Sequence, residues 1–433
     1  MNLYNNLSLK LMIGVLVLST IGLTLPAALS AGKIIKEIRI TGLTHTKKYI
    51  VARELLSKTG RPFSRETMKQ DRQRLMGLGI FSDVTIAALE QEDGIILTVT
   101  VKEISPFLPI AGFKIDDENG FALKAGVKSL SLFGRGIFFS ASATFGEASS
   151  YGFKIRNPWF AGKRMSYEIE LFHRIRNNDL DDFKEAGNEL FLTLSSLVGK
   201  RTRLGVRFSF QYIQSDTPGK TLSADNRDNV PSLGFFIGYD SRDLKWNPHS
   251  GRWNEIEILR SGLFGLLDSS FWRLNLDLRY YIPVAPRHTL ALFSLTTLTS
   301  GTVGKEIAPW QDFSIGGTNS IRGWELGSRT GKNQLLSTAE YRYQLMKPKA
   351  FRFLGFRLPI GLQIAAFADF GSAWNQRDEF NKNFIKGFGL GLRFITPTTG
   401  MARLDFGFGQ DGFSVRIHLG SYEKPVMQRQ RVR

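Results

Sequence analysis

Most of this chain alternates apolar and polar residues with a period of two. Between Arg273 and Tyr280, the leucines at 274, 276 and 278 alternate with charged or amide side chains. The segments around Val206 and Tyr341 repeat the pattern with a more aromatic apolar face. Such alternation predicts β-strands with one apolar and one charged face. From about residue 106 onward there are about 16 such segments, centred near 113, 125, 141, 154, 169, 191, 208, 236, 256, 275, 295, 340, 366, 391, 405 and 416.

Alternation alone leaves two architectures open. A soluble sandwich would bury the apolar faces in a core, whereas an outer-membrane barrel would turn them toward lipid. The long connections all follow odd-numbered segments, at residues 215–230, 301–332 and 372–386. Several connections after even-numbered segments are tight, such as 134–136, although those at 240–250 and 346–359 are longer than expected. Short periplasmic turns and long outer loops favour a 16-stranded antiparallel transmembrane β-barrel over residues 105–420.

The N-terminus predicts export. Lys10 precedes an apolar stretch over residues 11–25, and Ala28 and Ser30 supply the small residues that a signal peptidase reads. Residues 1–30 are therefore predicted to be a signal peptide that is cleaved between Ser30 and Ala31. Beyond it no run of about 18 apolar residues occurs, so no spanning helix is predicted.

Composition narrows the chemistry. The 433 residues include no cysteine, so disulfides and thiolate metal sites are excluded. The formal charge of +18 suits either nucleic acid or a surface of anionic lipids. The basic residues are spread over many segments, so no nucleic-acid partner is predicted. Hydrolase and metalloprotease motifs are absent and the five histidines are scattered, so we expect no enzyme, no cofactor and no metal site.

Residues 31–104 form a separate unit, in which the spacing of the apolar residues changes between that of a strand and that of a helix. Residues 34–40 read as a strand, 49–56 as a helix, and Ser64 is a candidate N-cap for a second helix through Leu75. Residues 81–87 and 95–101 read as two strands around a turn at Gly94. The segments 40–43, 53–55, 60–63 and 75–84 of this α+β unit, ordered βααββ, resemble a POTRA domain. An exposed sheet edge can accept an extended client strand, which is the role the resemblance implies.

Seven barrel segments resemble those of the BamA/TamA-like outer-membrane assembly factors. They are residues 132–136, 239–243, 313–317, 340–343, 367–371, 387–391 and 403–405. The resemblance implies a single-POTRA member of this superfamily that inserts β-barrel proteins into the bacterial outer membrane. The POTRA domain would lie in the periplasm and receive unfolded β-barrel clients. Lipid bilayer and lipopolysaccharide are the other implied partners, and the family pattern admits accessory assembly proteins.

One loop carries the family's most specific motif. Ile321, Arg322, Gly323 and Trp324 match its sequence of aliphatic residue, arginine, glycine and aromatic residue. In relatives this loop folds back into the lumen, and the resemblance places Arg322 against Glu340 and Asp369. Alternation independently points both carboxylates inward, because apolar residues flank each of them. We expect a charge-assisted pair between the guanidinium and the lumen wall.

The resemblance also implies a seam between the first and last barrel strands. The expected seam residues are Ile110, Ala111, Gly112, Phe113, Phe413, Val415 and Ile417. Pro106 and Pro109 fit a poorly paired edge. Clients would enter the membrane through this seam. Residues 421–433 are predicted to be a basic tail, and Trp159, Trp272 and Tyr280 to be interfacial anchors.

Two other functions remain open on sequence grounds. A two-partner-type secretion pore would export a polypeptide through the lumen, but such pores usually carry two POTRA domains and a plug helix. A passive porin would leave the POTRA-like unit without a role.

Overall fold

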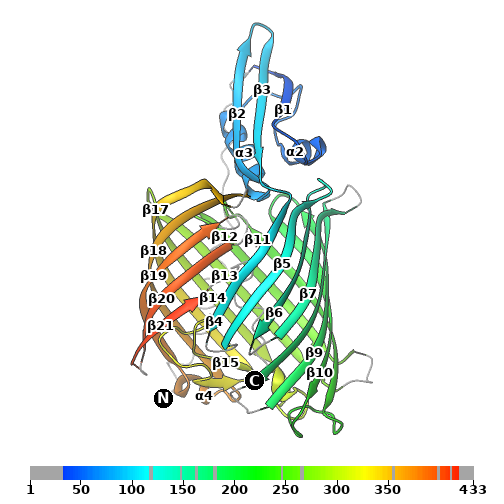
Figure 1. Cartoon of the computed structure of the whole chain (residues 1–433), viewed down its shortest axis with the longest axis vertical. Helices are drawn as coiled ribbons and strands as arrows, with labels where there is room; N and C mark the ends of the chain where they lie inside the picture. The colour runs from blue at the N-terminus through cyan, green and yellow to red at the C-terminus, as the bar shows by residue number, and fades with distance from the viewer. Residues whose placement is uncertain are drawn as a thin grey trace, which may run out of the picture.

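A computed structural model describes residues 33–116, 120–146, 149–160, 164–178, 183–244, 247–263, 268–353, 356–396, 400–409 and 412–418. Figure 1 shows a small α+β domain standing on one end of a large barrel. The predicted signal peptide, with Ser30 and Ala31, and the basic tail lie outside the described residues.

The N-terminal domain has the predicted βααββ order. Its elements are β1 (Ile35–Thr41), α2 (Lys48–Glu54), α3 (Arg65–Gly77), β2 (Phe81–Gln91) and β3 (Gly94–Glu103). The sheet order is β1-β3-β2, with β1 parallel and β2 antiparallel to β3. Both β1 and β2 are therefore edge strands of a three-stranded sheet.

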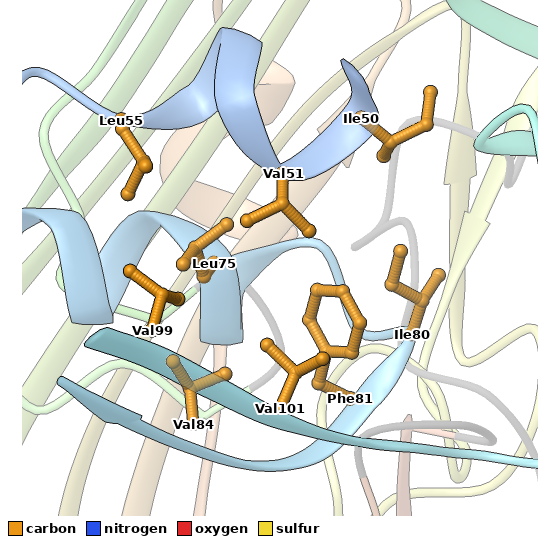
Figure 2. Packing of buried hydrophobic residues seen from close by; sticks show 9 residues of the cluster. All are labelled: Ile50, Val51, Leu55, Leu75, Ile80, Phe81, Val84, Val99 and Val101. Carbon is orange, nitrogen blue, oxygen red and sulfur yellow. The ribbon is translucent and has the colours of Figure 1, made fainter. Parts of the chain in front are cut away.

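Both helices pack on one face of this sheet. Figure 2 shows Val51 and Leu75 from the helices meeting Val84, Val99 and Val101 from the strands. The predicted cap is present, because the Thr67 amide donates to the Ser64 hydroxyl at 3.3 Å. Buried Asp71 of α3 accepts from the amides of Leu56 and Ser57, which fixes the C-terminal end of α2 against α3.

The barrel is one sheet of sixteen strands within the described residues. Each strand pairs antiparallel with the barrel strand that precedes or follows it in sequence, and β14 pairs with β17 across the loop that holds β15 and β16. The strands are β4 (Phe107–Asp116), β5 (Gly120–Leu132), β6 (Ile137–Gly146), β7 (Ser149–Phe160), β8 (Met165–Asn178), β9 (Phe183–Val198), β10 (Thr202–Ser215), β11 (Arg227–Asp240), β12 (Gly251–Ser261), β13 (Trp272–Ala285), β14 (His288–Thr299), β17 (Asn333–Phe353), β18 (Phe356–Trp374), β19 (Ile385–Thr396), β20 (Gly400–Gly409) and β21 (Gly412–His418). All sixteen predicted centres fall inside these strands, so the predicted fold class is confirmed.

The two faces of the sheet exclude a sandwich. Along β12 and β13 the apolar side chains face outward, and Ile258 is 51% exposed and Leu274 39% exposed. The charged side chains of the same strands face the lumen, where Glu257 is 4% exposed and Arg273 1% exposed. A sandwich core would bury the apolar face instead, so this pattern is that of a barrel in lipid.

The connection at 346–359 differs from its prediction as a long turn. The β17–β18 hairpin continues through it, with Phe351 paired to Leu358 and Phe353 to Phe356. Two register irregularities between Gln344 and Lys349 let the ladder bend and then resume. This stretch is rich in aromatic residues, which favour β-pairing. The apolar–polar alternation that marks the membrane-spanning part of a strand does not show how far a hairpin continues beyond the membrane.

The long connections lie at the barrel end away from the N-terminal domain. Figure 1 places β15 (Phe313–Ile315) and α4 (Glu379–Lys382), which belong to two of them, at that end. Among the described residues, the helices are all too short or too polar to cross a bilayer.

The N-terminal domain docks on the rim of the barrel. The Lys47 amide donates to the Gly134 carbonyl in the β5–β6 turn at 2.9 Å. Gly134 has φ +70°, and a Cβ there would lie 2.2 Å from the His45 carbonyl oxygen. Trp159 Nε1 donates to Glu54 Oε1 of α2 at 3.0 Å. Trp159 therefore joins two domains, in addition to any anchoring role, and its tie to α2 was not predicted.

Glu103 fixes the backbone of residues 44–46, which directly precedes the contact of Lys47 with the barrel rim. Its carboxylate accepts from the backbone amides of Thr44, His45 and Thr46 at 2.7–3.0 Å. Burial would raise the pKa of this carboxyl, but the hydrogen bonds from Thr44, Thr46 and His45 outweigh burial and lower the pKa to about 2.

We predict that Glu103→Gln destabilises the N-terminal domain at neutral pH. Because the folded pKa is depressed, the carboxylate's contribution is complete above its ordinary pKa of 4.5 and is lost as pH falls toward about 2. The thermal midpoint of the domain, measured by calorimetry on the full chain in detergent, should be lower in the variant near pH 7 and converge with wild type toward pH 2. Glu90→Gln, at an exposed ion pair with Lys33, is the control and should shift little. A pH-independent difference would contradict this assignment.

Candidate functional site: a loop held inside the barrel

The connection between β14 and β17 folds into the barrel. It contains a 3-10 turn (Pro309–Gln311), β15 and the short strand β16 (Arg329–Gly331), which pairs with β15. Ile321 is fully buried, and Arg322 and Trp324 are 2% and 5% exposed. All three side chains are therefore shielded from water.

Arg322 pairs with Asp369 of β18 through two parallel hydrogen bonds. Nε donates to Oδ2 at 2.7 Å and Nη2 donates to Oδ1 at 2.8 Å. The Arg322 backbone amide donates to the same carboxylate at 3.1 Å. Bidentate geometry of this kind is the strongest that a guanidinium makes with a carboxylate. The guanidinium carbon also lies 3.3 Å from the centroid of the Phe367 ring.

Two further carboxylates complete the site. Arg322 Nη1 lies 3.1 Å from Asp405 Oδ2 on β20 and 3.4 Å from Glu340 Oε2 on β17. Arg393 of β19 bridges the same two carboxylates, at 2.7 Å from Glu340 and 2.5 Å from Asp405. Arg342 Nε donates to Glu340 at 2.7 Å. We call this network of Arg322, Glu340, Asp369, Arg393 and Asp405 the latch.

Asp369 depends on the loop more than the other carboxylates do. It is completely buried, and its carboxylate accepts hydrogen bonds from Arg322 and from the Thr338 hydroxyl at 2.9 Å. Glu340 and Asp405 also have Arg393. Removal of the Arg322 guanidinium would therefore strand the Asp369 charge in particular.

The structure brings together Arg322, Glu340 and Asp369, the three residues that the family resemblance implied as partners. Asp405 and Arg393 were not predicted as members. The alternation of Leu404, Asp405 and Phe406 points Asp405 inward, as it does Glu340, so this signal was present in the sequence. Alternation gives only the face of a strand, and depth in the lumen depends on the register between strands.

Glycines let the loop backbone lie directly on the wall. Gly323 has φ +90°, and a Cβ there would lie 2.4 Å from the Phe408 carbonyl carbon. On the wall, a Cβ on Gly387 would lie 1.9 Å from the Arg322 carbonyl oxygen, and one on Gly409 would lie 2.4 Å from the Gly323 carbonyl oxygen. Side chains at these positions would push the loop away from β19 and β20.

Trp324 lies in the lumen and donates from Nε1 to the Lys386 carbonyl at 2.7 Å. It shares an apolar cluster with Ile321 and Ile315 of the loop and with Ile385 and Leu336 of the wall. Figure 1 places the β15 segment of this loop at the barrel end opposite the N-terminal domain.

The sheet begins at β4 and ends at β21. Cα atoms of these two strands approach within 8 Å, yet in the described residues no ladder joins them. Of the seam residues that the resemblance implied, Ile110, Ala111, Gly112 and Phe113 lie on β4, and Phe413, Val415 and Ile417 lie on β21. Figure 1 shows the two strands side by side. Elsewhere the described residues hold no cluster of His, Asp and Glu suited to a metal ion.

A POTRA-like domain joined to such a barrel defines a class of outer-membrane assembly and transport proteins. Residues 131–420 match the family model of the Omp85 superfamily domain, and residues 33–104 match the POTRA family model described as a surface antigen variable number repeat. The chain belongs to the Omp85 superfamily. It is thus a non-enzymatic protein of the bacterial outer membrane with its POTRA domain in the periplasm.

Similar proteins include the outer membrane protein assembly factor BamA of Nitratidesulfovibrio vulgaris, at 24% identity over 414 residues. That alignment covers 90% of this chain and 50% of the relative, so the chain spans about half the relative's length. A crystal structure of Haemophilus ducreyi BamA lacking POTRA domains 1–3 aligns with a TM-score of 0.57 at 16% identity, covering 90% of this chain and 84% of that one. CdiB from Acinetobacter baumannii aligns with a TM-score of 0.56 at 14% identity, covering 90% and 72%.

We predict that Arg322→Ala lowers the free energy of unfolding by about 3–5 kcal/mol, because it leaves the Asp369 charge buried without its cation. Adding Asp369→Asn should recover part of this loss, giving a coupling of at least about 1 kcal/mol between the two positions. Urea unfolding in lipid vesicles measures both values. Lys305→Ala, at an exposed position of the same loop, is the control. Additive effects of the two latch substitutions would show that the pair is not coupled.

Gly387→Ala should displace the loop, since its Cβ cannot share space with the Arg322 carbonyl oxygen. The expected result is tryptic cleavage after Arg322 in the folded barrel, where the wild-type site is protected by burial. Gly77→Ala is the matched control, because a Cβ there meets nothing within 4 Å. An unchanged digestion pattern for Gly387→Ala would mean that the wall tolerates the methyl group without moving the loop.

Proposed function

We propose that this protein assembles and inserts β-barrel proteins into the outer membrane. The observation that carries the proposal is that β4 and β21 approach each other without a ladder in the described residues, beside a wall that the latch stiffens. The latch joins the loop to β17, β18, β19 and β20, which lead up to β21. An opening force would therefore be relieved at the unpaired boundary before it separates the latched strands.

The seam gives client strands a template. Backbone donors and acceptors on the facing edges of β4 and β21, which no ladder pairs within the part of the chain that the structure describes, can be satisfied by an incoming strand. In a lipid environment such unpaired groups are costly. A client hairpin that pairs at this boundary gains hydrogen bonds without any covalent chemistry. The membrane and lipopolysaccharide are partners of the outward apolar belt, of which Ile258 and Leu274 are examples.

The POTRA domain is the proposed receiver of unfolded clients. The outer edges of β1 and β2 lie at the two sides of its sheet, and the backbone of Ile35 at the start of β1 already pairs with Gly60 and Arg61. The rest of β1 and the edge of β2 can accept an extended peptide by β-augmentation. We propose accessory assembly proteins as further partners of these edges. The named relative BamA is an assembly factor, and its role supports this proposal for the half of its length that the chain spans.

A secretion pore is the second candidate, because the fold is about as similar to CdiB as to BamA. In that case the loop that now lies in the lumen would have to leave it for a polypeptide to pass. The deep burial of Arg322 and its bidentate pair oppose such movement. The same buried loop also argues against a passive porin, because a porin needs an open lumen.

The test is reconstitution of the protein into liposomes with an unfolded β-barrel client, followed by heat-modifiable gel mobility. Wild type should speed client folding at least severalfold over empty liposomes, and Arg322→Ala should lose most of that gain. Lys305→Ala should retain it. The absence of any acceleration by wild type, combined with ion flux through the liposomes, would reject assembly activity in favour of a pore.

A further inference from the structure

A cavity of about 540 Å³ lies where α2 of the POTRA domain meets the barrel rim. Tyr49, Ala52 and Arg53 line it from α2, and Arg135, Ile137 and Trp159 line it from the barrel. Neither domain alone forms this cavity, because each supplies only one wall. Figure 1 shows α2 above this end of the barrel.

The barrel wall of the cavity belongs to the lipid-facing side. Along β6, Phe145 is 60% exposed on the outer face, whereas Phe138 is 8% exposed toward the lumen. Ile137 has the same parity as Phe145 and therefore faces outward. Nearby, Phe160 of β7 and Met165 of β8 are 50% and 45% exposed. The cavity thus adjoins the periplasmic edge of the apolar belt, at the depth where lipid headgroups lie.

Its two arginines have spare hydrogen-bonding capacity. Arg53 Nε is buried without a hydrogen-bond partner, and its nearest carboxylate oxygen, on Glu54, is 3.7 Å away. That carboxylate already accepts from Arg74 at 2.8 Å and from Trp159 at 3.0 Å. The Arg135 side chain has no hydrogen bond or ion pair within the described parts of the chain.

Aromatic rings orient the Arg53 guanidinium. Its carbon lies 5.0 Å from the Trp159 ring centroid and 5.9 Å from that of Tyr49. Rings that cover the face of a guanidinium leave its in-plane N–H groups available to an acceptor. Burial lowers the pKa of Arg53, with Glu54 opposing the shift, as expected for a cation that lost water without gaining a matched anion.

We propose that this cavity binds the phosphate of an anionic phospholipid headgroup from the periplasmic leaflet. Arg53 and Arg135 donate to the phosphate oxygens, and the acyl chains continue along the outward face near Ile137. Arginine pairs suit phosphate because their planar N–H groups match its oxygens. An inorganic phosphate ion would share the donors but gain nothing from the apolar wall. The bound lipid would link α2 to the rim and so set the POTRA domain relative to the membrane surface.

Native mass spectrometry of the detergent-solubilised protein tests this proposal with three probes: phosphatidylglycerol, diacylglycerol and inorganic phosphate. Wild type should retain phosphatidylglycerol and neither of the others at equal concentration. Arg53→Gln/Arg135→Gln should weaken phosphatidylglycerol binding at least tenfold. The charge-matched control Lys200→Gln/Arg201→Gln changes exposed residues of another rim turn and should stay within twofold.

Four outcomes would overturn the proposal. Equal phosphatidylglycerol retention by wild type and the arginine double variant would remove the site. Diacylglycerol binding as strong as that of phosphatidylglycerol would show that phosphate is not recognised, and equally strong inorganic phosphate would mean a free-anion site. Ala52→Phe fills the cavity and keeps both arginines, so it tests the site independently of the arginine double variant. Heat-modifiable gel mobility shows whether each variant is folded. Undiminished lipid binding by Ala52→Phe would contradict the proposed location.

Discussion

A guanidinium buried inside a barrel is stable only where carboxylates meet it with good geometry, and this constraint organises the C-terminal half of the molecule. Arg322 has lost nearly all contact with water and is surrounded by Asp369, Asp405 and Glu340. Its desolvation cost can be offset only if three strands hold their carboxylates at fixed depths. The register of β17, β18 and β20, the glycines that admit the loop and the burial of Trp324 all serve that one arrangement. The loop thus acts as an internal brace for the wall that leads to β21.

The latch makes one part of the barrel wall more strongly connected than the rest. The strands from β17 to β20 are joined by ladders and also by the latch, whereas β4 and β21 approach each other without a ladder in the described residues. Hydrogen bonds between strands and a charged network resist separation far more than side-by-side approach does. A seam beside a stiffened wall is the mechanical basis of the proposed insertion activity.

The sequence predicted the positions of the strands and helices better than it predicted the tertiary contacts between them. Period-two alternation located all sixteen barrel strands, and it identified the inward faces of Glu340 and Asp369, because the polar and apolar faces of a membrane barrel must differ. It did not rank Asp405 or Arg393 as partners of Arg322, since their depth in the lumen depends on the register between neighbouring strands. Trp159 read as an anchor because an aromatic residue at a strand end usually is one. Its bond to Glu54 joins residues 105 positions apart, which only the docking of two domains brings together.

A reversible cross-link between β4 and β21 would show whether client proteins need this boundary to open. The protein has no cysteine, so no native thiol competes with a pair placed at facing positions of β4 and β21, and non-reducing gel mobility separates the intramolecular disulfide from cross-linked dimers. The matched control places cysteines at Val206 and Leu194, partners on the existing β9–β10 ladder. The oxidised seam variant should stop accelerating client folding in liposomes and recover on reduction, while the control should be active in both states. Full client folding with the seam covalently closed would contradict it.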